Sequence, residues 1–446
     1  MSISISLNPP SLQSISCKKM SDYFNNSWEL YEWLFSSIID DETYYLSPDP
    51  LRNPLVFYFA HTAAFYINKL KLAGLIEEGI NSELDHLFAV GVDPSYVGEL
   101  DIAIKWPTMI EARAYRKMAR QKIENFITHH KWPKNIDESD PEWAFLMSME
   151  HDRIHFETSS VLIRQLPLHL VQKPRGWKYA SSGQFSSPHN WIKIDQAKVT
   201  IGQEKPSKLF AWDNEVGSLE CDVAPFAVTD IHVTNSQFLI FVEDGGYSKQ
   251  EFWSSQGWEW LQSNQLIMPK FWRKGGDNYL YRAMFDEFPL PQDWPAEVVC
   301  YEAMAYCKWL GEGCRLMTEA EWKFLANHAS GNCNLNLTYG SPRAADLSKN
   351  TSRFKVADIM GNVWDWVSND FYPLPQFKAH PFYTDFSLPF FDKEHGMMLG
   401  GSWASTGTSA SKNYRLWFRR NFIQHAGFRV AISLFAQTPS DIDTVS

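Results

Sequence analysis

The sequence predicts two domains, an N-terminal bundle of four helices followed by an irregular α+β domain. The chain has 446 residues, which is more than one hydrophobic core usually serves, so two domains are expected. From about residue 25 to about residue 170, apolar residues recur at three- and four-residue steps, the spacing of amphipathic helices. After about residue 190 this spacing ends, and short β-branched runs alternate with loops rich in Gly, Asn, Pro and Trp.

Four amphipathic segments build the predicted bundle. They lie around residues 28–38, 57–75, 110–127 and 141–166. Pro141 suits the first turn of the fourth helix and Pro167 ends that helix. Four helices of similar length, with rather long connections in the middle, are typical of a helical bundle.

Changes in composition place the predicted domain boundaries. Residues 1–24 are a Ser-rich lead-in, residues 25–172 are the bundle, and residues 173–190, rich in Pro, Gly, Ser and aromatic residues, are the linker. The second domain covers residues 191–436, and residues 437–446 form a tail. We expect the second domain to be held by aromatic packing more than by a regular sheet, because the chain contains 19 Trp.

Within the second domain, strands and helices are expected in short pieces. The β-branched runs are residues 198–201 and 226–228, and the helical segments lie near residues 234–243, 295–310 and 318–327. The last helix begins with Thr318 followed by Glu321, which is the pattern of a capping box.

Composition excludes several classes of protein. The net charge is −11 and no long run of Lys or Arg is present, which argues against a general binder of nucleic-acid backbones. We found no apolar segment of the length needed for a signal peptide or a membrane span, so neither export nor membrane insertion is expected. The six cysteines include no C-x-x-C pair, which favours a reducing cytoplasm over a zinc ribbon or a disulfide framework.

The motif with the most chemical content is His151-x3-His155-x-Glu157, inside the fourth predicted helix. Four residues make just over one helical turn, so both imidazoles project from one face and can bind one ion. Glu157 points to a different face, and we expect it to support the helix or a ligand rather than to bind the ion. Two histidines at this spacing are common by chance, so two unrelated polar residues are the competing interpretation.

His61, in the second predicted helix, is the candidate third ligand. Bundles commonly build metal sites from facing helices, although a single histidine more often serves the core or the surface. Three imidazoles leave positions open on the ion for a thiolate and for dioxygen. They suit Fe(II), Zn(II), copper or nickel, so the ligand type alone does not choose the metal.

Six short motifs follow one another through the second domain. They are VTNSQF from Val233, GGY from Gly245, RLMTEAEW from Arg315, GNVWDW from Gly361, GGSW from Gly400 and GFR from Gly427. Taken singly each is structural, because glycines allow close backbone approach and aromatic side chains fill the core. As an ordered set they resemble the domain shared by formylglycine-generating enzymes and non-haem iron sulfoxide synthases, which has a C-type-lectin-like α+β fold.

The first domain resembles the DinB-like four-helix bundle whose three histidines bind iron in those synthases. Together the two resemblances cover about residues 25–435. They imply an α plus α+β protein, a DinB-like bundle followed by a C-type-lectin-like domain of the formylglycine-generating-enzyme (sulfatase-modifying) type. They also imply His61, His151 and His155 as ligands of Fe(II), with O2 as co-substrate.

Several segments resemble the ovothiol branch of these synthases, whose members make 5-histidylcysteine sulfoxide. They include PLVFYFAHTAAFYINKLKLAGLI, HLFAVGVD, EHDRIHFETSSVLIRQLP and QHAGFRV. This resemblance implies an enzyme that couples L-cysteine to L-histidine. Two alternatives remain open: an ergothioneine-type or selenoneine-type synthase acting on trimethylhistidine, and a non-catalytic lectin-like protein carrying zinc.

The sequence departs from two relatives. Ovothiol-type enzymes often continue into a methyltransferase domain, and this sequence ends at Ser446, so we expect methylation by a separate polypeptide or none. Formylglycine-generating enzymes hold copper through a cysteine pair near the end of this domain, where NYRLWFRRNFIQHAGFRV contains no cysteine. That relative is therefore disfavoured.

The resemblance also implies an active-site tyrosine that donates a proton or hydrogen atom. Tyr383 in HPFYTDF is the preferred candidate and Tyr372 in DFYPLP the second, with aromatic packing as the competing role for both.

Amino-acid substrates bring carboxylates, which suit the guanidinium fork of arginine. By resemblance to ergothioneine-type synthases, the predicted substrate contacts are Asn413, Arg415, Trp417, Arg419 and Arg420. Structural salt bridges are the competing explanation for these arginines. No arginine lies between Arg52 and Arg113, the region where relatives that use γ-glutamylcysteine place carboxylate-binding arginines, so free cysteine is the expected thiol.

Overall fold

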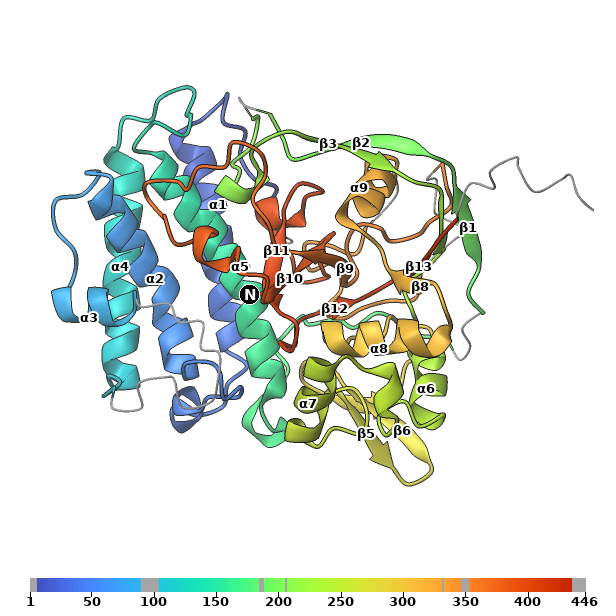
Figure 1. Ribbon diagram of the computed structural model, residues 1–446. Coiled ribbons are helices and arrows are strands. Elements are labelled where there is room, and N and C mark those ends of the chain that lie inside the picture. Colours follow the sequence, from blue (N-terminus) through green and yellow to red (C-terminus); the bar gives the residue numbers. More distant parts are fainter. Residues whose placement is uncertain are drawn as a thin grey trace, which may run out of the picture.

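The computed structural model describes residues 6–89, 104–183, 188–204, 207–330, 333–345 and 353–434. A helical region is followed by a sheet-rich region with its own short helices, which confirms the predicted α plus α+β class (Figure 1). No helix in this part of the chain is both long enough and apolar enough to cross a bilayer. The predicted tail, residues 437–446, lies outside the described residues.

Four long helices form the N-terminal bundle. They are α1 (Cys17–Phe35), α2 (Leu55–Leu72), α4 (Met109–His129) and α5 (Trp143–Gln165), and the short helix α3 (Ser82–Leu87) packs on α2. Both α1 and α2 contact α4 and α5, with aromatic rings such as Phe24 and Tyr66 meeting edge to face between them. The bundle is therefore closed around an aromatic core, as the sequence pattern predicts.

Helix α1 begins earlier than expected. It starts at Cys17, within the segment predicted as a loose lead-in, and the Ser16 side chain accepts a hydrogen bond from the Lys19 amide at its first turn. Met20, Tyr23 and Phe24 are buried on its inner face. The three- and four-residue spacing of these side chains extends the amphipathic pattern further toward the N-terminus than the sequence analysis placed it.

The described residues of the second region form four small sheets. One has the strand order β1 (Trp191–Ile194), β4 (Phe226–Thr229), β13 (Val430–Ser433) and β8 (Cys314–Leu316), with all pairs antiparallel. A second has the order β11 (Leu416–Arg419), β10 (His395–Leu399), β9 (Trp364–Asp370) and β12 (Ala426–Gly427), in which β12 runs parallel to β9. The others are the pair β2 (Ala197–Ile201) and β3 (Leu219–Val223), and the three-stranded sheet β5 (Trp272–Gly275), β6 (Asn278–Arg282) and β7 (Glu287–Pro289).

The described part of the second region also contains four α-helices. They are α6 (Asn235–Glu243), α7 (Ser255–Asn264), α8 (Cys300–Leu310) and α9 (Glu319–Asn327), of which α8 and α9 contact strands. The predicted capping box is present at α9, where the Thr318 amide donates to the Glu321 carboxylate at 2.8 Å and the Glu321 amide donates to the Thr318 hydroxyl at 3.2 Å. Helix α7 was not predicted, because it is short and carries Gly257 in its first turn, which weakens the helical pattern.

Helix α5 lies between the rest of the bundle and the sheets (Figure 1). The short 3₁₀ helix η7 (Gly407–Ala410) packs directly on it. Three buried charged residues of α5, Glu150, Glu157 and Arg164, recur every seven residues and so lie along one face of the helix. Each of them is bonded to the second region, so α5 is shared between the two parts of the protein.

Candidate metal centre

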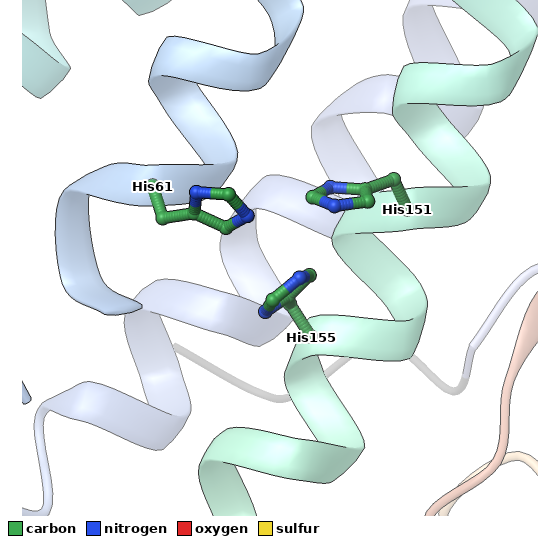
Figure 2. Close-up of side chains that lie close together, drawn as sticks. All are labelled: His61, His151 and His155. Atoms are coloured by element: carbon green, nitrogen blue, oxygen red, sulfur yellow. The ribbon is translucent and has the colours of Figure 1, made fainter. Parts of the chain in front are cut away.

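Three histidines from two helices meet beside the core of the bundle. His61 comes from α2, and His151 and His155 come from successive turns of α5 (Figure 2). Their ring centroids are 5.1 Å apart for His61 and His151, 4.6 Å for His61 and His155, and 4.3 Å for His151 and His155. One nitrogen from each ring can be chosen so that all three lie within 4.8 Å of one another, so a single ion could contact all of them.

The hydrogen bonds of these rings favour metal binding. Nδ1 of His61 lies 2.6 Å from the carbonyl oxygen of Phe88; since a carbonyl only accepts, Nδ1 carries the proton and Nε2 is left as the free lone pair. Both ring nitrogens of His151, and Nδ1 of His155, are buried and have no hydrogen-bond partner among the described residues. Buried polar atoms without partners are costly, and a bound metal ion would satisfy them.

Burial keeps all three imidazoles neutral. Desolvation lowers the pKa of His61 to about 4, and it lowers the pKa of His151 and His155 well below the usual value, helped by the mutual repulsion of the rings. Neutral imidazole is the form that binds metals, so the site needs no proton release from these rings near neutral pH.

Aromatic neighbours fix the planes of the rings. Phe65 stacks on His151 with centroids 3.5 Å apart and an interplanar angle of 8°, and Phe57 stacks on His61 at 4.8 Å. Since both phenylalanines are on α2, this helix orients one histidine of its own and one of α5. Such packing holds the ligands in place before a metal arrives.

A cavity of about 210 Å³ opens at the histidines between α5 and the second region. His151 and His155 line it, together with two residues predicted for the site, Tyr383 and Trp417. The Tyr383 ring lies 6.0 Å from His151 and 5.1 Å from Phe65, and the Lys69 ammonium lies 4.2 Å from its centre. Burial, followed by the charges of Asp385 and Asp213, raises the pKa of Tyr383, so its phenol stays protonated at neutral pH.

The structure does not bring the other predicted residues to this cavity. Arg415 is buried in a two-point ion pair with Glu319 at 2.7 and 3.0 Å, and its guanidinium lies over the ring of Tyr372. Asn413 accepts a hydrogen bond from Lys323 at 2.6 Å. Both predicted arginine contacts just before Gly427 are likewise outside the cavity lining: Arg420 pairs with Asp370, and Arg419 sits opposite His395 in the strand ladder.

These positions have a physical reason. A carboxylate partner offsets the cost of burying a guanidinium, and Glu319 at the start of α9 supplies one for Arg415. The competing interpretation, a structural salt bridge, therefore describes Arg415 in this structure, and Tyr372 packs against that pair.

Sequence reasoning missed several residues of the cavity wall. They are Asp49, Arg52, Tyr58, Ile154, Thr158, Val161, Leu162, Gln165, Asp385, Phe386, Phe390, Tyr414, Leu416, Phe418, Phe422, Ile423 and Gln424. The part from α5 was readable from the sequence, because Thr158, Leu162 and Gln165 continue the face of His151 and His155 at three- and four-residue steps. The loop residues carry no such signal.

Glu157 has a different role from the one expected. Its carboxylate accepts hydrogen bonds from Trp364 Nε1 at 2.7 Å, from the Ser402 hydroxyl at 2.5 Å and from the Ser405 hydroxyl at 2.7 Å. Trp364 belongs to the GNVWDW segment, Ser402 to the GGSW segment, and Ser405 lies two residues after GGSW. All three donors are in the second region, so Glu157 fixes that region against α5 instead of supporting only its own helix.

Glu150 and Arg164, the other two charged residues on this face of α5, also bond to the second region. Glu150 accepts from the amide and hydroxyl of Thr408 at 2.7 and 2.8 Å, and Arg164 donates to both carboxylate oxygens of Glu297 at 2.7 and 2.8 Å. Buried ion pairs and charge-assisted bonds of this kind fix relative position. The helix that carries two of the three histidines is therefore held to the second region at three points along one face.

Comparison with known proteins agrees with this arrangement. The model of the "Sulfatase-modifying factor enzyme 1-like domain" matches residues 180–346 and 344–434. The chain is similar to "Hercynine oxygenase" of Mycolicibacterium smegmatis, with 25% identity over 85% of this chain and 90% of that protein. It is also similar to "Ergothioneine biosynthesis protein 1" of Neurospora crassa, with 21% identity over 93% of this chain and 57% of that protein.

Among solved structures, PvdO from Pseudomonas aeruginosa aligns with a TM-score of 0.37 and 16% identity, over 55% of this chain and 94% of PvdO. The similarity to oxygenases extends along most of the chain and confirms that the protein is an enzyme, as predicted. With more than half of its length matched by the family model, the chain belongs to the sulfatase-modifying factor enzyme 1-like family.

Proposed function

We propose that this enzyme is a non-haem, Fe(II)- and O2-dependent sulfoxide synthase that joins the sulfur of a thiol amino acid to an imidazole carbon of a histidine-type substrate. The carrying observation is the cluster of three neutral imidazoles, in which both ring nitrogens of His151 and Nδ1 of His155 have no hydrogen-bond partner among the described residues, at a cavity that also contains the half-buried Tyr383. The similarity to hercynine oxygenases supports oxygen chemistry at this site over a structural zinc.

The overall reaction balances with O2 as the only oxidant. The thiol loses its S–H hydrogen and the imidazole carbon loses its C–H hydrogen, a C–S bond forms, and the sulfur gains one oxygen atom. The second oxygen atom leaves as water with the two hydrogens. The four electrons that O2 accepts come in equal parts from C–S bond formation and from sulfur oxidation.

Each part of the site has a defined task in this proposal. His61, His151 and His155 would hold the ferrous ion, which when bound supplies O2 activation and a cationic partner for a thiolate. Three neutral ligands leave the charge of the ion uncompensated, so an anionic sulfur is favoured at this point of the cavity. We propose that Tyr383, whose phenol stays protonated because desolvation raises its pKa and whose ring lies 6.0 Å from that of His151, donates a proton or hydrogen bond to a group bound at the histidines.

For the imidazole substrate, we propose trimethylhistidine (hercynine) first. The names of the similar enzymes support this choice, and so does the aromatic wall formed by Tyr414, Trp417 and Phe418. Aromatic faces attract a quaternary ammonium, which has no N–H group to donate.

Free L-histidine, the substrate implied by resemblance to the ovothiol branch, is the second candidate. A specific feature favours it: the carboxylates of Asp49 and Asp385 also line the cavity. Carboxylates pair with the N–H groups of a primary ammonium and gain less from a methylated one. Free L-cysteine is the proposed thiol for either candidate.

Product analysis tests this proposal. Purified protein is loaded with Fe(II) and incubated under air with L-cysteine and either trimethylhistidine or L-histidine, and product masses and O2 consumption are recorded. A sulfoxide from trimethylhistidine supports the first candidate, and one from histidine supports the second. Stoichiometric zinc with no O2 uptake from either mixture would overturn the enzyme proposal at this site.

A further inference from the structure

We propose that Arg52 binds the α-carboxylate of an amino-acid substrate inside the cavity. The inference rests on the function proposed above and names a contact that the sequence pattern does not reveal.

Arg52 is placed to reach a ligand at the histidines. It lies two residues before the N-cap of α2, the helix that carries His61, and lines the same cavity as His151 and His155. Its guanidinium carbon is 4.5 Å from the ring centre of Phe422 and 5.2 Å from that of Phe418, both in the second region. The side chain therefore bridges the bundle and the opposite wall, and the two rings restrict its orientation.

The charge of Arg52 is available for a ligand. It is the only lysine or arginine among the described residues that line this cavity, and it forms no ion pair with a carboxylate of the described chain. In contrast, Arg415, which the sequence suggested for this role, is already occupied by Glu319.

Guanidinium chemistry defines the ligand group. Arg52 interacts with the hydroxyl of Tyr58 but has no carboxylate partner among the described residues. A guanidinium has five N–H donors, so donors remain that match the two oxygens of a carboxylate. The α-carboxylate is the anionic group that cysteine, histidine and trimethylhistidine share. A cation beside three neutral imidazoles would thus select amino acids over the corresponding amines.

Binding without oxygen tests this assignment. The Fe(II)-loaded enzyme is titrated calorimetrically under argon with two matched pairs, L-cysteine against cysteamine and L-histidine against histamine, in which the second member lacks only the carboxylate. For the pair whose carboxylate Arg52 holds, the wild type should bind the acid about 10- to 100-fold more tightly than the amine, the range of a charge-assisted two-point contact.

Substitution then assigns the preference. In Arg52→Gln the ratio of acid affinity to amine affinity should fall to about threefold or less, while the affinity for the amine is unchanged. Arg52→Lys keeps the positive charge but lacks the planar guanidinium, so it should give an intermediate ratio. Arg113→Gln, which removes a guanidinium that pairs with Asp41 on the surface of the same bundle, should keep the wild-type ratio.

The outcomes separate the two substrates and the two proposals. A collapse of the cysteine ratio assigns the contact to the thiol substrate, and a collapse of the histidine ratio assigns it to the imidazole substrate. If the ratios of acid affinity to amine affinity were unchanged in Arg52→Gln, with iron content equal to that of the wild type, the proposal that Arg52 binds the α-carboxylate would be overturned. Failure of the wild type to form any sulfoxide under air would instead overturn the proposed function, because product formation by the wild type is measured independently of the Arg52 variants.

Discussion

Replacing Glu157 by alanine tests whether the second region holds the histidine helix in place. The substitution removes an acceptor of three hydrogen bonds and leaves Trp364 Nε1 and the hydroxyls of Ser402 and Ser405 without it. All four residues are at most 5% exposed, so water cannot replace the carboxylate without rearrangement. Each buried donor left without an acceptor costs about 1 kcal/mol or more, so the three together lower the unfolding free energy by about 3 to 5 kcal/mol.

The measurement is urea-induced unfolding followed by tryptophan fluorescence, with Trp364 itself at the affected contact. Glu124→Ala is the matched control, because Glu124 is a surface residue paired with Arg120 on α4, and its loss should change the unfolding free energy by less than about 1 kcal/mol. Retention of Co(II) during dialysis is the second readout, since His155 lies two residues from Glu157. Equal unfolding midpoints for the two variants would refute the view that this contact holds α5.

Three further predictions follow from the site. His151→Ala should abolish both iron retention and turnover, and elemental analysis of the dialysed variant showing one iron per chain would remove His151 from the ligand set. Tyr383→Phe should keep the iron but slow coupling at least about tenfold, because the ring remains and only the proton donor is lost; unchanged kcat at full iron content would exclude that role. The metal-free protein should lose stability as the pH falls. His61 has a pKa of about 4 in the folded state and an ordinary histidine pKa in the unfolded state, so acid protonates the unfolded state first and favours it. For His61 alone the loss begins near pH 6.5 and reaches about 2 kcal/mol by pH 5, so the unfolding free energy of His61→Gln should fall less between pH 7 and pH 5 than that of the wild type.

Sequence patterns located the helices of the site because the helical repeat determines which residues share one face of a helix. His151 and His155 are four residues apart in an amphipathic segment, and their common face follows from the helical repeat. His61 has no partner at helical spacing along the chain; its place in a neighbouring helix of the bundle made it a candidate, the resemblance to iron synthases supported it, and in the structure its ring centre lies 4.6 Å from that of His155.

The opposite wall was harder to predict because its residues come from loops and a short strand. Tyr383 and Trp417 were found by resemblance, whereas Arg52 was passed over and Arg415 was favoured. Local sequence does not state whether an arginine has a buried carboxylate partner, and Glu319, the partner of Arg415, lies ninety-six positions earlier in the chain. The start of α1 was missed for a simpler reason, since the Ser-rich composition before it concealed the buried spacing of Met20, Tyr23 and Phe24.

The three buried charged residues spaced seven apart on α5 have a consequence for engineering. A bundle cut free from its sheets would present Glu150, Glu157 and Arg164 on its flank with most of their partners removed, in surroundings packed for a dry interface. Transplanting the histidines into another scaffold therefore requires either carrying the adjoining half along or redesigning that flank for water. Without such a redesign, the two regions have to be transferred together, because both of them fix the position of the helix that carries His151 and His155.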